Sequence, residues 1–514
     1  MHVRFGVTVA AAALLLVVAA TPARNAPAQV QVRVTMTSGH CRAVPTLIDP
    51  GDTRFIFSDR MRRPSLFTIA GRRTRYVGPR HSTSIRVRLT RSAIYRYFCI
   101  SRGPRRVVRT GVVAVRPPPA PPPEPPQHRI AIRPAHSTSE LFDRTTGLTF
   151  VPRGNDYVRI GSQEDYDGHV FSYHSTFNVG LYDGPRAEVA LERMRADGYN
   201  TVRVFLNGLC RSACLGDPSH DIRSLYVANV ADFLQRAKAN GMFVILTIDW
   251  LPLRTSYDRL LNADPRTWVD GTNLNYLSSG GVRANSDFFR DLIKELIRQR
   301  APTDVVLAYE LRNELSFDSQ SKPFTLTSGL APMPNGRTYD LSSQAQKNQL
   351  LDDNLVYWIS RVRSAIIAVD PTALVTVGFF EPQEPNPSRR GDPRIIRTRA
   401  AIRDSVADFF DIHAYPGLDL TLPQYMENFG IDGTEAKPIV IGEMGAFKSA
   451  FADVNGAALA LRGWQHDSCA YGIDGWLTWT WDTDEQPELW HALSGGGVIE
   501  RALAPAKRPD PCSP

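Results

Sequence analysis

The sequence predicts two folded parts, a small all-β sandwich followed by a (β/α)8 barrel of the TIM-barrel type. Three observations lead to this fold class. Short alternating segments precede residue 117, a proline-rich stretch covers 117–127, and strand-like and helix-like segments alternate after it to the C-terminus. A chain of 514 residues also favours two domains over one.

The first 28 residues have the pattern of a secretory signal. A short basic start (His2, Arg4) precedes an apolar run that ends near Ala20, and small residues follow, with Ala-x-Ala at Ala26–Ala28. The run is shorter than the roughly 20 residues that a spanning helix needs. An uncleaved membrane anchor is the alternative. We expect a secreted protein that carries no transmembrane segment in its mature chain.

The chain has six cysteines, and in an exported protein these favour disulfides over metal sites. Proximity in the predicted organisation suggests Cys41–Cys99, Cys210–Cys214 and Cys469–Cys512, although other pairings are open.

Residues 29–116 form the predicted β-sandwich. Apolar and polar residues alternate in segments such as "QVQVRVTM", "TRFIFS" and "TSIRVRLT", and Gly, Pro and Asp punctuate them at short intervals. The order of the segments resembles the cupredoxin fold. That resemblance places Cys99 at the position of a copper ligand, but Ser65 and Leu66 stand where a His is expected, and no His or Met follows Cys99 in the module. A blue-copper site also needs two imidazoles, so we expect a copper-free module.

The formal net charge of +8 is unevenly distributed. Residues 29–116 hold 19 Arg, no Lys and only three Asp (Asp49, Asp52 and Asp59), so the rest of the chain is net negative. Such a basic module can attract an anionic cell-envelope surface or another anionic polymer. The alternative is a domain whose exposed strand faces are Arg-rich without a binding role.

Residues 117–127, "PPPAPPPEPPQ", predict an extended linker, which leaves 128–514 as the barrel domain. Eight strand candidates follow: "LTFVPRGNDYV", "YNTVRVFLN", "MFVILTIDW", "VVLAYELRNE", "ALVTVGFFE", "DFFDIHAYPG", "PIVIGEMGA" and "IDGWLTWTWD". Amphipathic segments at 187–198, 230–241, 286–301 and 354–370 lie between them. Eight apolar strands with helical crossovers predict a closed barrel. A doubly wound open sheet is the competitor, but its usual Gly-rich phosphate turn is missing from the sequence.

A barrel of this type carries its active site at the carboxyl ends of the strands. Those ends supply residues that can hydrogen-bond, ionise or stack: Asn155, Tyr157, Arg203, Asn207, Asp249, Trp250, Asn313, Glu314, Glu381, His413, Tyr415, Glu443, Trp479 and Trp481.

Two of these strands end in glutamates, Glu314 and Glu443, three βα units apart, which puts them on opposite sides of the barrel mouth. Two carboxyl groups about 5 Å apart can hydrolyse a glycosidic bond with retention. One attacks the anomeric carbon, and the other donates a proton to the leaving oxygen. The alternative is that both are solvated strand-end glutamates.

Five ordered segments, "VRVFLN", "LRNE", "DIHAYPG", "VIGEMGA" and "GWLTWTWD", resemble the retaining glycoside hydrolases of clan A, most closely family 5, which includes cellulases and β-mannanases. The resemblance covers about 148–500. It implies that Glu314 is the acid/base and Glu443 the nucleophile. It also implies substrate-binding or supporting roles for Asn313, Arg203, His413, Tyr415 and Trp479.

These roles predict opposite pKa shifts for the two glutamates. We expect Arg203 and Tyr415 to lower the pKa of Glu443, and the charge of Glu443 to raise the pKa of Glu314. Each supporting residue also has a structural interpretation: Arg203 as a barrel ion-pair partner, His413 as a core histidine, and Trp476, Trp479 or Trp481 as packing. Glu310 is interpreted as structural.

The sequence departs from the family pattern at strand three, where Asp249 and Trp250 stand instead of a histidine. Residues 315–347 are expected to wall the cleft. No motif predicts a cofactor or a metal site. The predicted function is a secreted, monomeric β-glycosidase acting on a β-linked carbohydrate and not on nucleic acid. The alternatives are a carbohydrate-binding pseudo-enzyme, an envelope-binding protein, or a transglycosylase.

Overall fold

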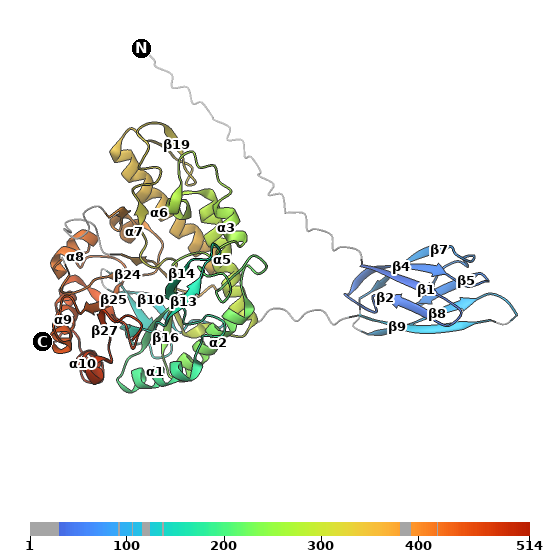
Figure 1. Cartoon of the computed structure of the whole chain (residues 1–514), viewed down its shortest axis with the longest axis horizontal. Coiled ribbons are helices and arrows are strands. Elements are labelled where there is room, and N and C mark those ends of the chain that lie inside the picture. Colours follow the sequence, from blue (N-terminus) through green and yellow to red (C-terminus); the bar gives the residue numbers. More distant parts are fainter. Residues whose placement is uncertain are drawn as a thin grey trace, which may run out of the picture. The chain divides into compact units, whose positions relative to one another are not determined.

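The computed structural model describes residues 30–90, 93–104, 106–115, 124–135, 138–380, 392–418 and 420–513. The chain divides into two compact units, Met1–Pro121 and Pro122–Pro514 (Figure 1). This division falls inside the predicted proline-rich linker. The predicted signal, residues 117–123 of the linker and Glu381 lie outside the described residues.

The first unit consists of two β-sheets, in the orders β2-β1-β4-β7 and β3-β9-β8-β5-β6. Buried and exposed residues alternate along most of the strands, as in β1, because successive side chains point to opposite faces. The bounds are β1 Val30–Met36, β2 Cys41–Val44, β3 Leu47–Ile48, β4 Gly51–Asp59, β5 Ser65–Ile69, β6 Arg72–Arg73, β7 Ser82–Leu89, β8 Ile94–Ser101 and β9 Val108–Val115.

The core of this unit is built around Phe55, Phe57, Phe67 and Tyr97, and the Cys41–Cys99 disulfide lies within it. Because Cys99 is bonded to Cys41, its sulfur is not a thiolate that could bind copper. The predicted pairing is therefore confirmed, whereas the resemblance to cupredoxins stays a prediction.

The second unit is a parallel β-barrel, and all eight predicted strands are present. Strand five is divided at Val377 into β21, which pairs with β17, and β22, which pairs with β24, and this closes the barrel. The bounds are β12 Arg153–Asp156, β15 Thr201–Leu206, β16 Phe243–Ile248, β17 Val306–Glu310, β21 Val375–Thr376, β22 Gly378–Phe379, β24 Phe410–His413, β25 Ile439–Phe447 and β26 Ile473–Trp479. The predicted fold class is confirmed.

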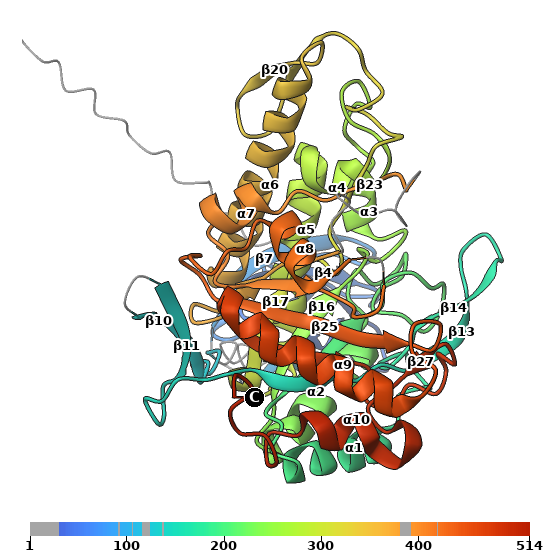
Figure 2. The same cartoon turned by 90° about the vertical axis from the view of Figure 1, so that its left-hand side faces the viewer.

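Helices surround the strands (Figures 1 and 2). They are α1 Gly184–Ala196, α2 Ser224–Ala239, α3 Ser256–Leu261, α4 Leu274–Leu277, α5 Ser279–Arg298, α6 Gln344–Ile367, α7 Arg399–Asp404, α8 Leu422–Phe429, α9 Val454–Asp467 and α10 Ser494–Leu503. Side-chain caps fix several starts: Asp183 accepts from the amide of Arg186, and Asp453 from those of Asn455 and Gly456. The four predicted helices begin earlier than their apolar patterns, by about one turn at α1 and by more than one turn at α2, α5 and α6.

Several hairpins outside the barrel have no counterpart in the prediction. They are β10 Ile130–Ala135 with β11 Thr138–Asp143, β13 Ile160–Glu164 with β14 Val170–His174, and β19 Leu330–Pro332 with β20 Thr338–Asp340. Two short strands, β18 Phe317–Asp318 and β23 Arg394–Ile395, also pair, and β27 Leu489–Trp490 extends the sheet beside β25. The hairpin β19–β20 and α6 extend from the barrel (Figures 1 and 2).

Two further disulfides, Cys210–Cys214 and Cys469–Cys512, match the predicted pairing. The second joins the C-terminal segment to the turn after α9. Within the described part of the chain, no helix is both long and apolar enough to cross a bilayer.

Candidate active site

A cavity of about 580 Å³ opens at the carboxyl ends of the barrel strands. Ligand pockets usually enclose roughly 300–1,000 Å³. Seven of the residues singled out in the sequence line it: Asp249, Trp250, Asn313, Glu314, Tyr415, Glu443 and Trp479. Strand ends that are far apart in the sequence therefore meet at one site, as the closed barrel requires.

Glu314 and Glu443 face each other in this cavity. Glu314 follows β17, Glu443 lies within β25, and carboxylate oxygens of the two lie within 4.8 Å of one another and of a ring nitrogen of His413. The side chain of Glu443 is 4% exposed, and that of Glu314 is 28% exposed. Retaining glycosidases hold their two carboxyl groups roughly 5–5.5 Å apart, so this spacing suits a double displacement.

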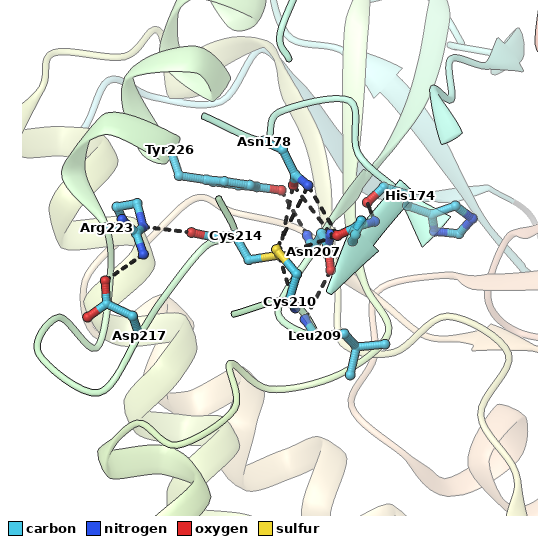
Figure 3. Close-up of a disulfide and its surroundings, with 10 residues drawn as sticks. His174, Asn178, Asn207, Leu209, Cys210, Cys214, Asp217, Arg223 and Tyr226 are labelled. Atoms are coloured by element: carbon cyan, nitrogen blue, oxygen red, sulfur yellow. Dashed lines mark hydrogen bonds and ion pairs between the residues drawn. A yellow bond between two sulfur atoms is a disulfide. The ribbon is translucent and has the colours of Figure 1, made fainter. Parts of the chain in front are cut away.

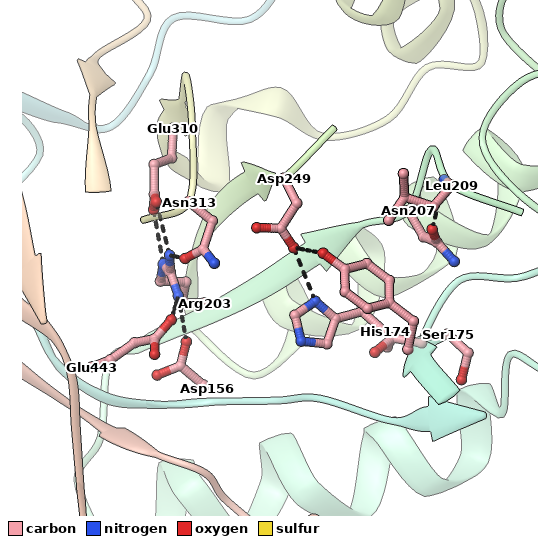
Figure 4. Close-up of polar contacts among 12 residues, drawn as sticks. Asp156, His174, Ser175, Arg203, Asn207, Leu209, Asp249, Glu310, Asn313 and Glu443 are labelled. Carbon is pink, nitrogen blue, oxygen red and sulfur yellow. Dashed lines mark hydrogen bonds and ion pairs between the residues drawn. The ribbon is translucent and has the colours of Figure 1, made fainter. Parts of the chain in front are cut away.

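Arg203, on β15, is fully buried and holds Glu443 in place (Figure 4). One terminal nitrogen donates to Oε1 of Glu443 at 2.7 Å and to Oδ1 of Asp156 at 3.0 Å. The other nitrogens bind both oxygens of Glu310 at 2.8 Å. Glu310 is fully buried and does not line the cavity, so it acts on the site through Arg203 and through His413, beside which it lies.

Asp411, on β24, brings a further carboxylate to Arg203, at 3.4 Å from Nε. It fits because residue 442 is glycine: a Cβ built there would meet an oxygen of Asp411 at 1.9 Å. The glycine before Glu443 therefore allows the buried carboxyl of Asp411 to approach β25.

One guanidinium cannot neutralise four buried carboxyl groups, and the pKa values reflect this. Burial raises the pKa of Asp156 and of Asp411 well above the usual value, which favours their neutral forms. Burial also raises the pKa of Glu443, although His413, Arg203 and the Tyr415 hydroxyl act in the opposite direction. The predicted lowering is therefore wrong, because desolvation outweighs the donors.

Tyr415 and His413 complete the surroundings of the two glutamates. The Tyr415 hydroxyl donates to Oε2 of Glu443 at 2.5 Å. Nδ1 of His413 lies 3.1 Å from Oε1 of Glu314 and 3.4 Å from Oε2 of Glu443. Burial lowers the pKa of His413 to about 4, so the imidazole is neutral near pH 7 and can accept or donate a single proton there.

Glu314 has the pKa that a general acid requires. Burial raises it to about 7, and the charge of Asp249 adds to the effect. The pKa shift of Glu314 has the predicted direction. Its causes are burial and then the charge of Asp249, whereas the prediction named the charge of Glu443. Its backbone also adopts a φ of 45°, in the left-handed region, which costs a non-glycine residue on the order of 1–3 kcal/mol.

Asn313 and Trp479 present their side chains to the cavity. Oδ1 of Asn313 accepts from Arg203 at 2.6 Å, which leaves its amide nitrogen to donate to a ligand. Of Trp476, Trp479 and Trp481, only Trp479 lines the cavity. Trp476 donates to Ser468 in the core, and Trp481 packs against Tyr199.

The hairpin β13–β14 contributes cavity residues that the sequence analysis did not find. The Tyr173 hydroxyl donates to Oδ2 of Asp249, and Nδ1 of His174 lies 3.3 Å from the same oxygen (Figure 4). Burial would raise the pKa of Asp249, but His174, Arg312 and Tyr173 lower it below its usual value. The alternating pattern around "DYDG" was a hairpin signal that could have located these residues.

Asn207 lies outside the cavity, beside the Cys210–Cys214 disulfide (Figure 3). Its amide donates to Gln163 at 2.6 Å and its oxygen accepts from the amide of Leu209 at 3.0 Å. Asn155 and Tyr157 are buried in the barrel and do not line the cavity either. These three strand-end residues therefore support the wall of the barrel.

Part of the segment 315–347 walls the cavity, as expected. Ser316, Phe317, Asp318 and Gln320 line it, together with Arg312 and Arg394, whereas the hairpin β19–β20 does not.

Two clusters bring carboxylates and His413 close enough to hold a metal ion: Glu310 with Asp411, and Glu314 with Glu443. In the first, Arg203 already supplies the positive charge. In the second, Glu443 is bound by Arg203 and Tyr415. A cation would have to compete with these partners.

A closed parallel barrel with two carboxyl groups at this spacing in its mouth defines the class of glycoside hydrolases. The family model Cellulase (glycosyl hydrolase family 5) matches residues 164–485, more than half of the chain. The chain belongs to glycosyl hydrolase family 5, and it is a glycoside hydrolase.

One solved structure shows the same fold at low sequence identity, and a second is reported with it as a similar structure. The endo-1,4-beta-mannanase from Rhizomucor miehei is 13% identical with a TM-score of 0.51, over 74% of this chain and 99% of that one. The exo-beta-1,4-mannosidase Op5Man5 from Opitutaceae bacterium strain TAV5 is 15% identical with a TM-score of 0.46, over 73% of this chain and 62% of that one. Among curated protein sequences there is no significant match.

Proposed function

We propose that this protein is an exported, retaining β-glycosidase that hydrolyses a β-linked polysaccharide or oligosaccharide. Glu443 is the nucleophile and Glu314 the acid/base. The observation that carries the proposal is the approach of the two carboxyl groups to within 4.8 Å at the mouth of the barrel.

In the first step, a carboxylate oxygen of Glu443 attacks the anomeric carbon while the bond to the leaving oxygen breaks. Glu314, with a pKa of about 7, gives its proton to that oxygen. Arg203 and Tyr415 hold the carboxylate of Glu443 in the attacking orientation. The product of this step is a glycosyl ester on Glu443.

In the second step, Glu314 is a carboxylate and removes a proton from water, whose oxygen attacks the same anomeric carbon. The ester bond breaks, and Glu443 leaves as a carboxylate. The free amide nitrogen of Asn313 would donate to the sugar 2-hydroxyl, and Trp479 would stack against a pyranose face. A sugar hydroxyl in place of water would give transglycosylation.

The order in which substrates are tested follows from the similar proteins. Both solved structures described above are named for action on β-1,4-mannosides, and the family model is named for cellulases. We therefore propose β-mannan as the first substrate and β-glucan as the second.

The test compares the full chain with Glu443→Gln and Glu314→Gln on a panel of β-glycans, with product size and anomeric configuration as readouts. We expect Glu443→Gln to lose at least a thousandfold in kcat/KM, because no nucleophile remains. Glu314→Gln should keep a measurable first step only on aryl glycosides, whose leaving groups need no proton. Glu427→Gln, at an exposed position of α8, serves as the matched control.

Three results would contradict the proposal. Inverted product configuration would exclude a covalent intermediate. Full turnover by Glu443→Gln would exclude this residue as the nucleophile, and binding without turnover by the unaltered protein would favour a carbohydrate-binding pseudo-enzyme.

We also propose that the first unit holds an anionic cell-envelope polysaccharide. The outer face of the sheet β2-β1-β4-β7 carries Arg33, Arg42, Arg54, Arg86 and Arg88. Among the described residues, none of these five is paired with a carboxylate. Export is supported by the predicted signal and by the pairing of all six cysteines.

A further inference from the structure

The structure assigns to Arg312 the recognition of a carboxylate-bearing sugar: we propose that the cleft accepts a uronic acid residue beside the acid/base. This inference rests on the proposed glycosidase function and names the substrate class of that same site.

Arg312 lies in the cavity and stands two residues before Glu314. Its backbone is held by the neighbouring strand, because its carbonyl accepts from the amide of Gly378 at 2.9 Å. Its guanidinium lies 3.9 Å from the ring centroid of Trp250, the residue that follows Asp249 after β16. Two adjacent strand ends therefore fix the position of this cation in the wall of the cleft.

The guanidinium of Arg312 has no carboxylate partner among the described residues, and its Nε is buried without a hydrogen bond. Other partly buried arginines of the barrel are paired: Arg159 with Asp482, Arg363 with Asp408 and Arg397 with Asp352. A partly desolvated cation without a partner is unfavourable. Stacking on an indole stabilises the cation by only about 0.5–2 kcal/mol, so the N–H donors of the guanidinium are available to a ligand.

The nearest acidic groups of the cavity are already engaged. Asp249 accepts from Tyr173 and contacts His174, and Asp318 accepts from the amide of Gln320 and from Ser321. Arg203 offsets the charge of Glu443, and Glu314 is protonated below its pKa of about 7. The charge of Arg312 helps to lower the pKa of Asp249, but no hydrogen bond or ion pair joins these two side chains, so the guanidinium keeps its N–H donors for an incoming carboxylate.

A carboxylate fits this group better than a hydroxyl does. Two parallel N–H donors of a guanidinium match the two oxygens of a carboxylate, and charge-assisted bonds of this type are roughly twice as strong as neutral ones. The resemblance to family 5 implies no role for this arginine.

The experiment uses one matched pair of substrates, a neutral β-mannan or β-glucan oligosaccharide and the same oligosaccharide with its primary hydroxyls oxidised to carboxylates. The measured quantity is the ratio of kcat/KM for the oxidised to that for the neutral substrate. We expect Arg312→Gln to lower this ratio about 10- to 100-fold, as loss of a charged hydrogen bond does. Arg312→Lys keeps the charge but not the two parallel N–H donors, so it should give an intermediate ratio. This variant also keeps the proposal testable if Arg312→Gln fails to fold.

Arg394→Gln is the control for charge alone, because Arg394 lines the same cavity but is bound by Asp392 at 2.8 Å. It should change the ratio less than threefold. An equal effect of both variants would overturn the proposal in favour of long-range electrostatics. An unchanged ratio in Arg312→Gln would overturn it as well.

Calorimetry with Glu443→Gln separates this inference from the proposed function, since binding needs no turnover. Tighter binding of the oxidised oligosaccharide that is lost in Glu443→Gln/Arg312→Gln supports the subsite even if hydrolysis is not observed. Equally tight binding of the two oligosaccharides overturns the inference even if hydrolysis is observed.

Discussion

Glu314 shows how the barrel adjusts the chemistry of a single side chain. The residue is held in a left-handed backbone conformation at the end of a buried strand, and burial raises its pKa to about 7. A glutamate with this pKa is mostly protonated at pH 6 and mostly ionised at pH 8. The same residue can therefore act as acid in one step and as base in the next.

The alkaline limb of kcat/KM should follow Glu314, because activity requires its protonated form. We expect activity to fall as the pH rises through about 7. Asp249→Asn removes a negative charge that favours protonation, so deprotonation becomes easier and the limb moves to lower pH. The measurement is kcat/KM between pH 4 and 9 on a neutral substrate.

Asp318→Asn is the control for this pH shift, because Asp318 lines the same cavity and does not contribute appreciably to the pKa of Glu314. The assignment of the alkaline limb to Glu314 would be contradicted if the limb did not move in Asp249→Asn. It would also be contradicted if the limb moved equally far in Asp318→Asn.

At the scale of single residues, the sequence located Glu314, Glu443 and Asn313 because each follows closely on an apolar run, although β25 continues beyond Glu443 to Phe447. It did not predict the pKa of Glu443 correctly. A list of donors shows what favours the charged form, whereas desolvation depends on how many carboxyl groups the fold buries around Arg203.

Among the elements, the hairpin β13–β14 has the largest effect on the site beyond the barrel itself. It brings Tyr173 and His174 to Asp249, the position where the sequence departs from the family pattern. Asp249, which stands at strand three where the family pattern has a histidine, is thus in contact with a hairpin outside the barrel. Sequence periodicity could not show this contact, because the two segments are about 75 residues apart.

The disulfides of the barrel unit should differ in their contribution to stability. Cys469–Cys512 closes a loop of 43 residues and Cys210–Cys214 one of only four. In the chain-entropy model, replacing the first pair by serines lowers the free energy of unfolding by about 4 kcal/mol, and replacing the second by about 2 kcal/mol. Urea unfolding of the two double-serine variants under non-reducing conditions measures the difference.

The unaltered protein in the same buffer is the reference for both variants. Equal losses would show that local packing, for instance around Asn207 and Gln163, outweighs loop entropy.

For the whole molecule, the first unit concentrates positive charge on an otherwise net negative chain. Arg54 and Arg86 lie directly opposite each other on β4 and β7. Like charges in such a cross-strand pair are destabilising. A binding role accounts for this cost, since an anionic chain lying on the face would neutralise both residues.

This face should retain the full-length protein on immobilised polygalacturonate in a salt-dependent way. We expect Arg54→Ser/Arg86→Ser/Arg88→Ser to elute at clearly lower salt than the unaltered protein, because three contacts to the polymer are lost. Arg72→Ser/Arg73→Ser/Arg75→Ser removes the same charge around β6 and should elute near the unaltered protein. Equal shifts in both variants would mean that net charge, and not this face, causes retention.

By itself the sequence determined the all-β unit, the eight barrel strands and the two facing glutamates, and it suggested the disulfide pairing that the structure contains. Each of these depends on local periodicity or on the order of strands along the chain. The tertiary structure alone decided which strand-end residues reach the cavity, why burial outweighs the donors around Glu443, and that Arg312 lacks a carboxylate partner among the described residues. These properties depend on contacts between strands and hairpins distant in sequence, and no pattern along a single segment records them.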